Sequence, residues 1–376
     1  MMPSKQRIAF VANTSWSIYK FRLPVLQALV KKGFEVYVLA PRDRYTDFFE
    51  QTPGLHFIEL KKFRSKSLSP ADDLQLYWEL LYYYKRLRPR LIFHYTIKAN
   101  IYGSLAAGRA GCPTVSVITG LGYMFAKKGI ARFIASALYR FALKKTKEVW
   151  FLNPDDQRYF TEEKLVTAEK TFLLPGEGVD TGTFYPAPYH HKKTPLQFLL
   201  VARLIEHKGI YEFAKAATML LAKGFHAQFC LIGFFDPKSA VAISKEQLAR
   251  WQTMGSIMYL GETDHVIPYI EKADCIVLPS YSEGMPLSLL EGASMCKALI
   301  ASNVPGCRQI VADGQNGFLC HPKDAADLAA KMEQYYRLPA TDKTAMGLAG
   351  RAMILKHFTS EIITDIYIRK LDSLKS

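Results

Sequence analysis

Residues 275–300 read CIVLPSYSEGMPLSLLEGASMCKALI, and the fold class can be inferred from them. The stretch opens with an apolar run, Cys275–Pro279, continues with a polar turn, Ser280–Gly284, and then shows a helix pattern with Pro286 in its first turn. Another apolar run follows at Ala298–Ser302. Short buried strands separated by a helix are typical of a parallel sheet that is covered by helices on both faces.

The same alternation extends along the chain in both directions. In the first half the predicted strands are Arg7–Asn13, Glu35–Ala40, His56–Leu60, Leu91–Tyr95, Thr114–Thr119 and Glu148–Leu152. In the second half they are Leu196–Val201, Ala227–Ile232, Ile257–Leu260, Cys275–Pro279 and Ala298–Ser302. Helix patterns occur at residues 21–33, 74–87 and 361–374. We therefore predict the α/β class, with two doubly wound, Rossmann-like domains in tandem.

The predicted domain linker lies in a segment rich in proline, glycine and charge, Pro175–Pro195. The expected boundaries are residues 1–180 for the first domain, 181–195 for the linker and 196–356 for the second domain. Residues 357–376 are expected to form a helix that packs back on the first domain. With two such sheets facing each other, ligands are expected in the cleft between them, at the carboxyl ends of the strands.

The composition is that of a globular chain. Of the 376 residues, 49% are hydrophobic and 22% are charged, which excludes a disordered chain and fits two cores. The longest uncharged stretch, Ala110–Ala126, contains glycines and a proline, so no membrane-spanning helix is expected. The six cysteines form no CxxC pair, which favours buried thiols in a reducing compartment over a metal site. We expect a cytoplasmic protein, since the first apolar run is too short for a secretory signal.

Positive charge is concentrated in the first half of the chain. Overall, 49 Lys and Arg residues face 34 Asp and Glu residues, a net charge of +15. Up to Pro188 the counts are 28 and 16, a net of +12, and the remainder holds 21 and 18, a net of +3. The first half is therefore expected to meet a large anionic partner, such as an anionic membrane or a nucleic acid.

An anion site is predicted where the strand at 275–279 gives way to a helix. Gly284 and Met285 offer backbone N–H groups beside a helix N-terminus, where the helix dipole also favours negative charge. Glu283 precedes this point, and Glu291 lies eight residues later, tilted back toward the helix start. Phosphates flanked by two carboxylates that can bind hydroxyl groups suit a nucleotide sugar. The alternative is an ordinary solvated helix start.

Two cations follow the first strand of the second domain. Arg203 and Lys208 stand in the loop after Leu196–Val201, which opens at the same edge of the sheet. Arginine can bind a diphosphate with its planar fork, and lysine adds a point charge. Both would stabilise negative charge that develops on a leaving phosphate. A solvated basic loop is the alternative.

The motifs ARLIEHKG, residues 202–209, and PSYSEGMPLSLLEG, residues 279–292, resemble the retaining family-4 glycosyltransferases of the GT-B fold, whose hallmark is Glu-x7-Glu. GETDHVIPYIEKADCIVLPS and VPGCRQIVADGQNGFLC also match the second domain of that family. In the first domain, SIYKFRLPVLQAL, HYTIKANIYGSLAAG and TGLGYMF resemble transferases that extend lipid-linked oligosaccharides for protein glycosylation and surface polysaccharides. The resemblance implies a retaining hexosyltransferase without metal or cofactor, whose substrates are a nucleotide sugar, expected to be UDP-linked, and a polyprenyl-diphosphate saccharide.

The resemblance also implies roles for individual residues. Glu283 would be catalytic at the donor sugar, while Arg203 and Lys208 would act at the diphosphate in place of a magnesium ion. The donor site would further contain Gly284, Met285, Glu291, Gly233, Thr263, Asp264 and Val266. The transferred sugar is expected to be a hexose or an N-acetylhexosamine. In a front-face reaction the leaving phosphate itself takes the proton of the acceptor.

The first domain is expected to bind the acceptor. The candidate contacts are Asn13, Ser15, Lys20, Arg22, His94, Lys98, Thr119 and Gly120. Many members of the family carry a histidine where SVITGLG places Thr119 and Gly120, which leaves His94 as the nearest substitute. The alternative for His94 is a satisfied core histidine, and for Lys20 and Arg22 it is a solvated helix face.

A basic amphipathic stretch runs from Lys127 to Lys147 and has seven basic residues and no acidic one. The basic residues are Lys127, Lys128, Arg132, Arg140, Lys144, Lys145 and Lys147. Apolar residues recur at helical spacing, namely Ile130, Phe133, Ile134, Ala137, Leu138 and Phe141. This pattern predicts a helix that binds the cytoplasmic face of an anionic membrane. The alternative is a core helix with solvated lysines.

Two other functions stay open from the residues. A nucleic-acid-binding α/β protein would explain the basic charge, although the aromatic residues do not interleave with the basic patches. A sugar-nucleotide epimerase of the same fold would turn over a nucleotide sugar without any acceptor.

Overall fold

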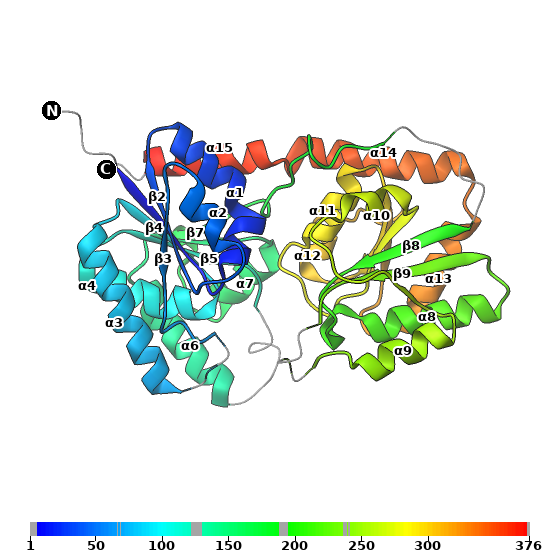
Figure 1. Ribbon diagram of the computed structural model, residues 1–376, viewed down its shortest axis with the longest axis horizontal. Coiled ribbons are helices and arrows are strands. Elements are labelled where there is room, and N and C mark those ends of the chain that lie inside the picture. The colour runs from blue at the N-terminus through cyan, green and yellow to red at the C-terminus, as the bar shows by residue number, and fades with distance from the viewer. Residues whose placement is uncertain are drawn as a thin grey trace. The chain divides into compact units, whose positions relative to one another are not determined.

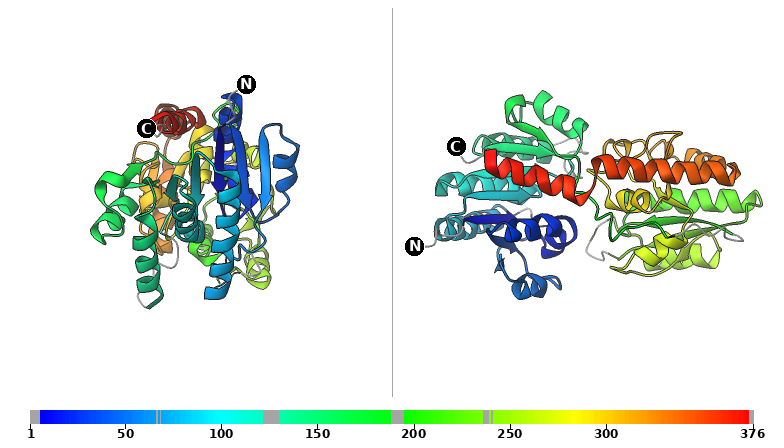
Figure 2. Two further views of the ribbon diagram at one scale, coloured as in Figure 1. Left: turned by 90° about the vertical axis from the view of Figure 1, so that its left-hand side faces the viewer. Right: turned by 90° about the horizontal axis from the view of Figure 1, so that it is seen from above.

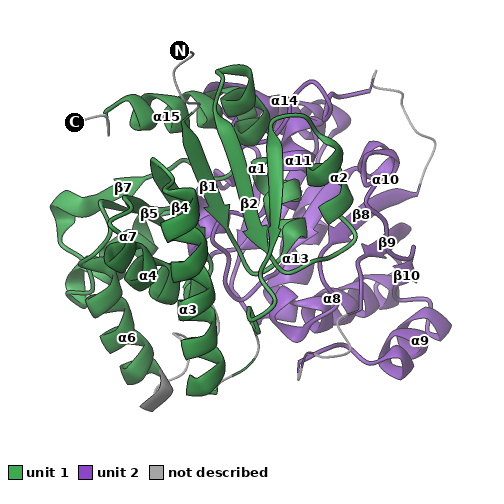
Figure 3. Ribbon diagram, turned by 60° about the vertical axis from the view of Figure 1, so that its left-hand side comes forward, with its two compact units in different colours: residues 1–177, 360–376 green, residues 178–359 purple. Residues whose placement is uncertain are grey.

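Figure 1 shows the protein as a computed structural model. The structure describes residues 6–65, 67, 69–121, 130–187, 195–235, 239 and 241–373. The chain divides into two compact units. Unit 1 comprises Met1–Glu177 and Ser360–Ser376, and unit 2 comprises Gly178–Thr359 (Figure 3). Among the described residues, no helix is long and apolar enough to cross a membrane.

Unit 1 is built on seven parallel strands in the order β3-β2-β1-β4-β5-β6-β7. Their bounds are β1 Arg7–Val11, β2 Glu35–Ala40, β3 Leu55–Glu59, β4 Leu91–Tyr95, β5 Thr114–Ile118, β6 Glu148–Phe151 and β7 Thr171–Leu173. In the centre, Ile8 of β1 is in register with Val36 of β2 and Leu91 of β4. Every residue of β4 and β5 is buried, because helices cover both faces of the sheet.

The helices of unit 1 form two layers. They are α1 Ser15–Lys31, α2 Thr46–Gln51, α3 Pro70–Leu87, a π-helix Ala99–Gly103, α4 Ser104–Ala110, α6 Ile130–Leu143, α7 Pro154–Glu162, a 3-10 turn Ala168–Lys170 and α15 Ser360–Ser373. Side chains alternate between the faces of the sheet: Ala9 and Val11 pack in one core with α3. On the other face, Phe10 lies 6.4 Å from Tyr367 of α15, between ring centroids. The C-terminal helix thus covers the sheet of unit 1, beside α1 (Figure 2).

Unit 2 repeats the architecture with six parallel strands in the order β10-β9-β8-β11-β12-β13. The strands are β8 Leu196–Val201, β9 Ala227–Ile232, β10 Met258–Tyr259, β11 Cys275–Leu278, β12 Ala298–Ser302 and β13 Gly317–Cys320. The helices are a 3-10 turn Glu206–Lys208, α8 Ile210–Ala222, α9 Lys245–Thr253, α10 Ile267–Lys272, α11 Leu287–Ser294, α12 Pro305–Arg308, α13 Ala325–Arg337 and α14 Ala340–His357. A hydrophobic core of this unit packs α8 and α13 on the sheet.

The predicted α/β class with two doubly wound, Rossmann-like domains is confirmed. The first helix was predicted from Phe21, but it begins at Ser15, because the Thr14 hydroxyl caps it by accepting a bond from the Ser17 N–H at 3.1 Å. The short strands β7 and β13 were not predicted, since three or four residues carry too little pattern.

Candidate active site

The carboxyl edge of the unit 2 sheet contains a topological switch point. β8 lies between β9, which follows it directly in the chain, and β11, which comes later. Open α/β sheets bind ligands where the strand order reverses in this way. The loops after β8, β9, β11 and β12 all open at this edge, and they carry most of the residues predicted for the donor site.

The loops after β8 and β11 are joined by an ion pair between Lys208 and Glu283. The Lys208 Nζ donates to the Glu283 Oε1 at 2.5 Å. The two side chains are 20% and 10% exposed, so each charge depends on the other for much of its stabilisation. The Tyr281 N–H also donates to the carbonyl of His207 at 2.9 Å. The structure thus brings together two of the three residues predicted to be catalytic.

Arg203, the third of these residues, lies in the same loop after β8. Its side chain is exposed, between the end of the strand and the 3-10 turn that carries Lys208. An exposed guanidinium at this edge can bind a phosphate through two parallel N–H groups. Among the described residues, no three or more His, Cys, Asp or Glu side chains group as metal ligands.

Two glycines allow the loops of this edge to approach each other closely. A Cβ on Gly209 would lie 2.0 Å from the carbonyl oxygen of Pro279, and one on Gly306 would lie 2.4 Å from that of Gly284. Backbone cannot approach a real Cβ so closely, so these positions require glycine. The Gly306 N–H also donates to the Glu283 carbonyl at 3.2 Å. The loop after β12, which sequence reasoning left out of the site, therefore supports the backbone that carries the Glu283 side chain.

The helix after β11 begins at Leu287, with Pro286 as its N-cap. No side chain caps this end, and the Leu289 N–H already donates to the Pro286 carbonyl at 3.2 Å, so the N–H groups of Leu287 and Ser288 are those that a ligand or water can bind. Met285 and Glu291 are buried beside it, at 7% and 3% exposure, and Gly284 is buried as well. Their contacts with a donor remain predictions.

The residues predicted to lie near the nucleoside occupy two neighbouring loops. Gly233 follows β9, and its Cβ would lie 1.7 Å from the carbonyl oxygen of Ala202, in the loop after β8. Thr263 and Asp264 stand between β10 and α10, where Val266 is the N-cap of the helix. Because β10 is the edge strand beside β9, these loops share one end of the sheet.

For Ser15 and His94 the expected acceptor contact is wrong. Both side chains are fully buried, and the Ser15 hydroxyl donates to the Pro41 carbonyl at 2.9 Å. The His94 Nε2 lies 2.9 Å from the Tyr84 hydroxyl, and its Nδ1 lies 3.3 Å from the Ser104 hydroxyl. Burial lowers the pKa of His94 to about 3, so the imidazole stays neutral. His94 is therefore a satisfied core histidine between α3 and α4.

Arg22 also has a structural contact in place of the expected acceptor contact. Its guanidinium pairs with Glu177, and the two side chains are 4% and 6% exposed. It lies 4.1 Å from the ring centroid of Tyr95, whose hydroxyl is 2.9 Å from that of Tyr367. A buried cation that is already paired is not available to a pyrophosphate. This cluster instead joins α1, β4 and α15 to Glu177, the last residue before the chain leaves unit 1.

The other expected acceptor residues are half-buried. Most lie at the carboxyl edge of the unit 1 sheet: Asn13 after β1, Lys98 after β4, and Thr119 and Gly120 after β5. The Lys98 Nζ donates to Asp73 at 2.6 Å, so its charge is already matched. Lys20 lies on α1. Acceptor binding by these residues remains a prediction.

Sequence reasoning missed Thr96, which follows β4 at this edge. Its φ of 72° is strained for a β-branched residue, and its buried hydroxyl has no hydrogen-bond partner among the described residues. A π-helix, Ala99–Gly103, follows it. Strained residues and π-helices concentrate at functional sites, so Thr96 joins the candidates. No sequence signal indicates a positive φ at a threonine.

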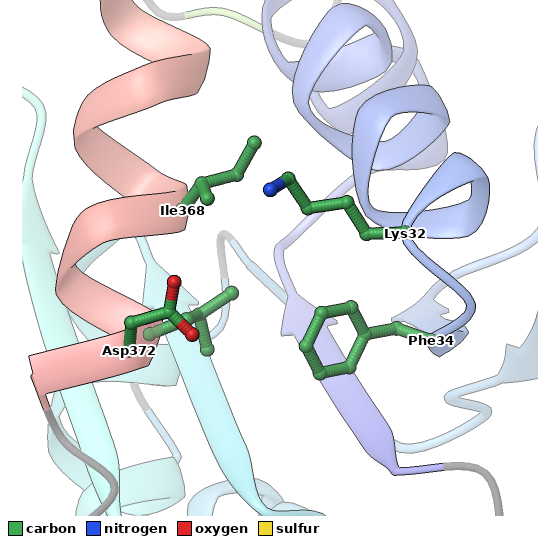
Figure 4. A pocket seen from close by; sticks show the side chains of 5 residues that line it. Lys32, Phe34, Ile368 and Asp372 are labelled. Carbon is green, nitrogen blue, oxygen red and sulfur yellow. The ribbon is translucent and has the colours of Figure 1, made fainter.

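A hollow of about 240 Å³ lies elsewhere in unit 1 (Figure 4). It is lined by Lys32 and Phe34, where α1 leads into β2, and by Ile368, Leu371 and Asp372 of α15. This is the amino edge of the sheet, whereas parallel sheets bind ligands at the carboxyl edge. We therefore do not assign it to the active site.

Comparison with known proteins identifies the family. The family description "Glycosyl transferase 4-like domain" matches residues 23–176, and "Glycosyl transferases group 1" matches residues 183–353. The N,N'-diacetylbacillosaminyl-diphospho-undecaprenol alpha-1,3-N-acetylgalactosaminyltransferase of Campylobacter jejuni is 30% identical, over 97% of this chain and 98% of its own. This chain belongs to the glycosyltransferases. The transferase is also 23% identical to the UDP-Gal:alpha-D-GlcNAc-diphosphoundecaprenol alpha-1,3-galactosyltransferase of Escherichia coli, over 80% and 83% of the two chains.

Solved structures share the fold of the transferase. Sucrose-phosphate synthase from Thermosynechococcus elongatus superposes with a TM-score of 0.83 at 19% identity, over 98% of this chain and 99% of its own. Anabaena HepE, in complex with UDP and glucose, gives a TM-score of 0.76 at 17% identity, over 98% and 100%. The GT-B fold that the motifs implied is thereby confirmed. Neither the nucleic-acid-binding alternative nor the epimerase has support in these comparisons.

In the transferase, α6 presents apolar side chains outward. Phe133, Ile134 and Phe141 are 76%, 52% and 59% exposed, and Ala137 is exposed as well. The opposite face packs in a core through Ala135, Tyr139, Ala142 and Leu143, and Leu138, another of the apolar residues at helical spacing, packs against that core. The side chain of Ile130 lies outside the described part.

The basic residues of this region divide into three groups. Lys144, Lys145 and Lys147 are exposed. Arg132 pairs with Glu163 at 3.2 Å, and Arg140 donates to backbone carbonyls of the same neighbouring turn. Lys127 and Lys128 lie outside the described residues. Four of the seven predicted membrane cations, Arg140, Lys144, Lys145 and Lys147, are therefore exposed on or just after α6.

Proposed function

We propose that the protein transfers a hexose or an N-acetylhexosamine from a UDP-sugar to a saccharide linked to polyprenyl diphosphate. The observation that carries this proposal is the Lys208–Glu283 pair, with Arg203 in the same loop, at the switch point of unit 2. The two relatives with diphospho-undecaprenol substrates in their names, one of which uses UDP-Gal, support the substrate classes.

The two cations act on the leaving group. As the bond between the sugar C1 and the phosphate oxygen breaks, negative charge develops on the diphosphate and positive charge on the sugar ring. Arg203 and Lys208 stabilise the diphosphate, and the Glu283 carboxylate stabilises the oxocarbenium-like ring. When Lys208 binds the diphosphate, its ion pair with Glu283 breaks. The Glu283 carboxylate is then available to contact the sugar.

The proposed transfer retains the configuration at C1. The acceptor hydroxyl attacks from the face on which the diphosphate leaves, and its proton passes to the departing phosphate oxygen. No side chain has to act as base, which agrees with the burial of His94. Both relatives make α-1,3 linkages according to their names, and common UDP-hexoses are α-glycosides, which supports retention.

The proposed reaction needs no metal ion and no cofactor. Arg203 and Lys208 supply the positive charge that magnesium brings to many diphosphate-leaving reactions. The nucleotide sugar is a substrate.

The lipid anchor of the proposed acceptor places the reaction at a membrane. We assign the outward face of α6 to the cytoplasmic surface of an anionic bilayer. Phe133, Ile134 and Phe141 would enter the headgroup region, and the exposed lysines that follow α6 would be drawn to anionic lipid.

A transfer assay tests the proposal. The purified protein is incubated with a short-chain polyprenyl-diphosphate saccharide and, in turn, UDP-glucose, UDP-galactose and their N-acetylamino counterparts. We expect one donor to give UDP and an α-linked, lengthened lipid saccharide, also in the presence of EDTA. In a thermal-shift series, UDP should raise the melting temperature more than GDP or ADP. Donor turnover without a glycosylated acceptor would count against the proposal and for the epimerase.

A further inference from the structure

A second helix of unit 1, α3, carries an outward apolar stripe. Leu74, Trp78 and Tyr82 are 56%, 59% and 56% exposed. Their spacing of four residues places them on one face of the helix. The opposite face packs in the core through Leu76, Leu80, Leu81 and Tyr84. Core packing therefore explains one face of α3 and leaves the other unexplained.

The stripe lies in the same helical layer as the outward face of α6. α4 packs against both α3 and α6, so the three helices cover one face of the unit 1 sheet (Figures 1 and 3). Among the described residues, fourteen large apolar side chains are exposed, and α3 and α6 hold six of them. Scattered exposed apolar residues are normal, but a concentration in one layer indicates a binding surface.

The exposed charges of this layer are all basic in the part that the structure describes. They are Lys85 and Arg86 on α3, Arg109 on α4, Arg140 on α6, and Lys144, Lys145 and Lys147 after it. The acidic residues of α3 are half-buried and bonded: Asp73 pairs with Lys98, and Glu79 accepts two backbone N–H groups. Beside the layer, at the end of α7, Glu162 and Glu163 are exposed, and Glu163 pairs with Arg132 of α6. The exposed charges of α3, α4 and α6 themselves are cations, which makes this apolar surface complementary to anionic lipid.

The outer half of α3 extends past the strands. The helix has 18 residues and the neighbouring β4 has five, which correspond to about 27 Å and about 17 Å. α3 runs antiparallel to the strands, so its N-terminal turns project beyond their carboxyl ends, as α6 does (Figures 1 and 2). Leu74 and Trp78 lie in this half, on the side of unit 1 where the acceptor is expected.

We infer that α3 and α6 together form a membrane-docking surface, in which Leu74 and Trp78 enter the headgroup region of an anionic bilayer. Tryptophan and tyrosine favour this region because they combine an apolar body with a polar tip. Docking through both helices brings the carboxyl edge of the unit 1 sheet to headgroup level, where the diphosphate of a lipid-linked acceptor lies. The inference rests on the proposed function, which assigned only α6 to the membrane.

Vesicle binding by the full-length protein tests the inference. The double variant Leu74→Ser/Trp78→Ser should bind phosphatidylglycerol-containing vesicles at least about tenfold more weakly, because two apolar side chains no longer leave water. The matched control is Leu348→Ser/Leu355→Ser on α14 of unit 2, where the leucines are 59% and 49% exposed. It should bind as the parent does. Melting curves confirm that each variant folds.

Trp78 also serves as a direct probe. Brominated lipids should quench a part of the parent's fluorescence that the Trp78→Phe variant lacks. Equal vesicle binding by the parent and the Leu74/Trp78 variant, or no quenching that depends on Trp78, would overturn the inference. A dimer in solution that is lost in the double variant would also overturn it, by making a second copy the occupant.

A lipid-free assay separates this inference from the proposed function. UDP release and transfer to a water-soluble, short-chain acceptor should be the same for the parent and the Leu74/Trp78 variant. If the parent itself makes no product, the proposed function fails. If the parent is active and vesicle binding does not depend on α3, only the docking inference fails.

Discussion

At the scale of the residue, the Lys208–Glu283 pair connects the proposed diphosphate contact to the proposed sugar contact. The two residues lie 75 positions apart and meet at 2.5 Å in a largely buried pair. Removal of one partner leaves the other charge uncompensated, so single variants at this pair measure more than one lost contact.

Glu283→Gln should lower kcat at least about 100-fold and leave UDP affinity largely intact, because in the proposed mechanism the carboxylate acts on charge that develops in the transition state. Steady-state kinetics and calorimetric UDP titration give the two values. Glu246→Gln, at an exposed position on α9, is the control and should behave as the parent does. Near-normal turnover in Glu283→Gln would remove this residue from the mechanism.

Arg203→Ala and Lys208→Ala should each lower turnover at least about 100-fold, since each would lose a charge that stabilises the leaving diphosphate in the proposed mechanism. Activity of the parent should survive EDTA. The exposed Lys215 of α8 provides the control variant Lys215→Ala. A strict requirement for magnesium or manganese would show that the two cations do not have this role.

His94 should make the protein sensitive to acid. Its pKa of about 3 in the folded state lies below the ordinary value of 6.5, so the unfolded state binds the proton more readily. The stabilisation is present above the unfolded pKa and is lost as the pH falls toward the folded pKa. Between about pH 7 and pH 5, the free energy of unfolding should fall by about 2 kcal/mol more in the parent than in His94→Gln. The free energies of unfolding are measured by denaturant titration. If they fall equally in the parent and in His94→Gln, the account is contradicted.

At the scale of the element, the active edge depends on close contacts between loops that follow different strands. The start of α12, which follows β12, contacts the loop after β11 at Gly306, where there is no space for a side chain. Its position fixes the backbone that carries Glu283, so a change here should alter catalysis without removing a catalytic group.

Gly306→Ala should lower kcat/KM about 100-fold, because the added Cβ displaces the Gly284 carbonyl and shifts Glu283 by a fraction of an ångström or more. Gly350→Ala on α14 is the control, since its Cβ would meet only ordinary contacts at 3.5 Å and beyond. That variant should keep its activity and its melting temperature. If Gly306→Ala has the kinetics of the parent, the contact is not part of the site.

At the scale of the whole molecule, the uneven charge assigns different tasks to the two halves of the chain. The first half, up to Pro188, carries +12 of the total +15. A nearly neutral second half suits the binding of a small ligand that one or two cations can neutralise. The basic half suits a large anionic surface.

Replacement of Lys144, Lys145 and Lys147 by Gln should weaken binding to anionic vesicles, by about 1 kcal/mol per lysine that lies near the lipid. Raised salt should weaken binding of the parent in the same direction. Donor hydrolysis in solution should not change. The control replaces Lys215, Lys272 and Lys356 of unit 2, which are also exposed. If the variant that lacks Lys144, Lys145 and Lys147 binds vesicles as the parent does, these lysines are not part of the docking surface.

Much of the fold followed from local pattern. Apolar runs predicted the bounds of β2, β4, β8, β9 and β12 without error. A strand that helices cover on both faces is apolar along most of its length, so its ends are marked by the first polar residues. The motifs around Arg203, Lys208 and Glu283 indicated the family, since a strand end, a glycine and a helix start are specified within a few residues.

Tertiary structure decided which polar residues near the strand ends are left for substrate. Ser15, Arg22 and His94 have the side chains of binding residues, yet distant partners such as Glu177 and Tyr84 satisfy them inside unit 1. Packing in unit 1 also turned Phe133 and Ile134 outward and strained Thr96. Packing in unit 2 brought Lys208 to Glu283. The sequence specified the strands, the helices and the type of site through short-range patterns. Burial and pairing depend on residues far apart in the chain, so only the folded structure could assign them.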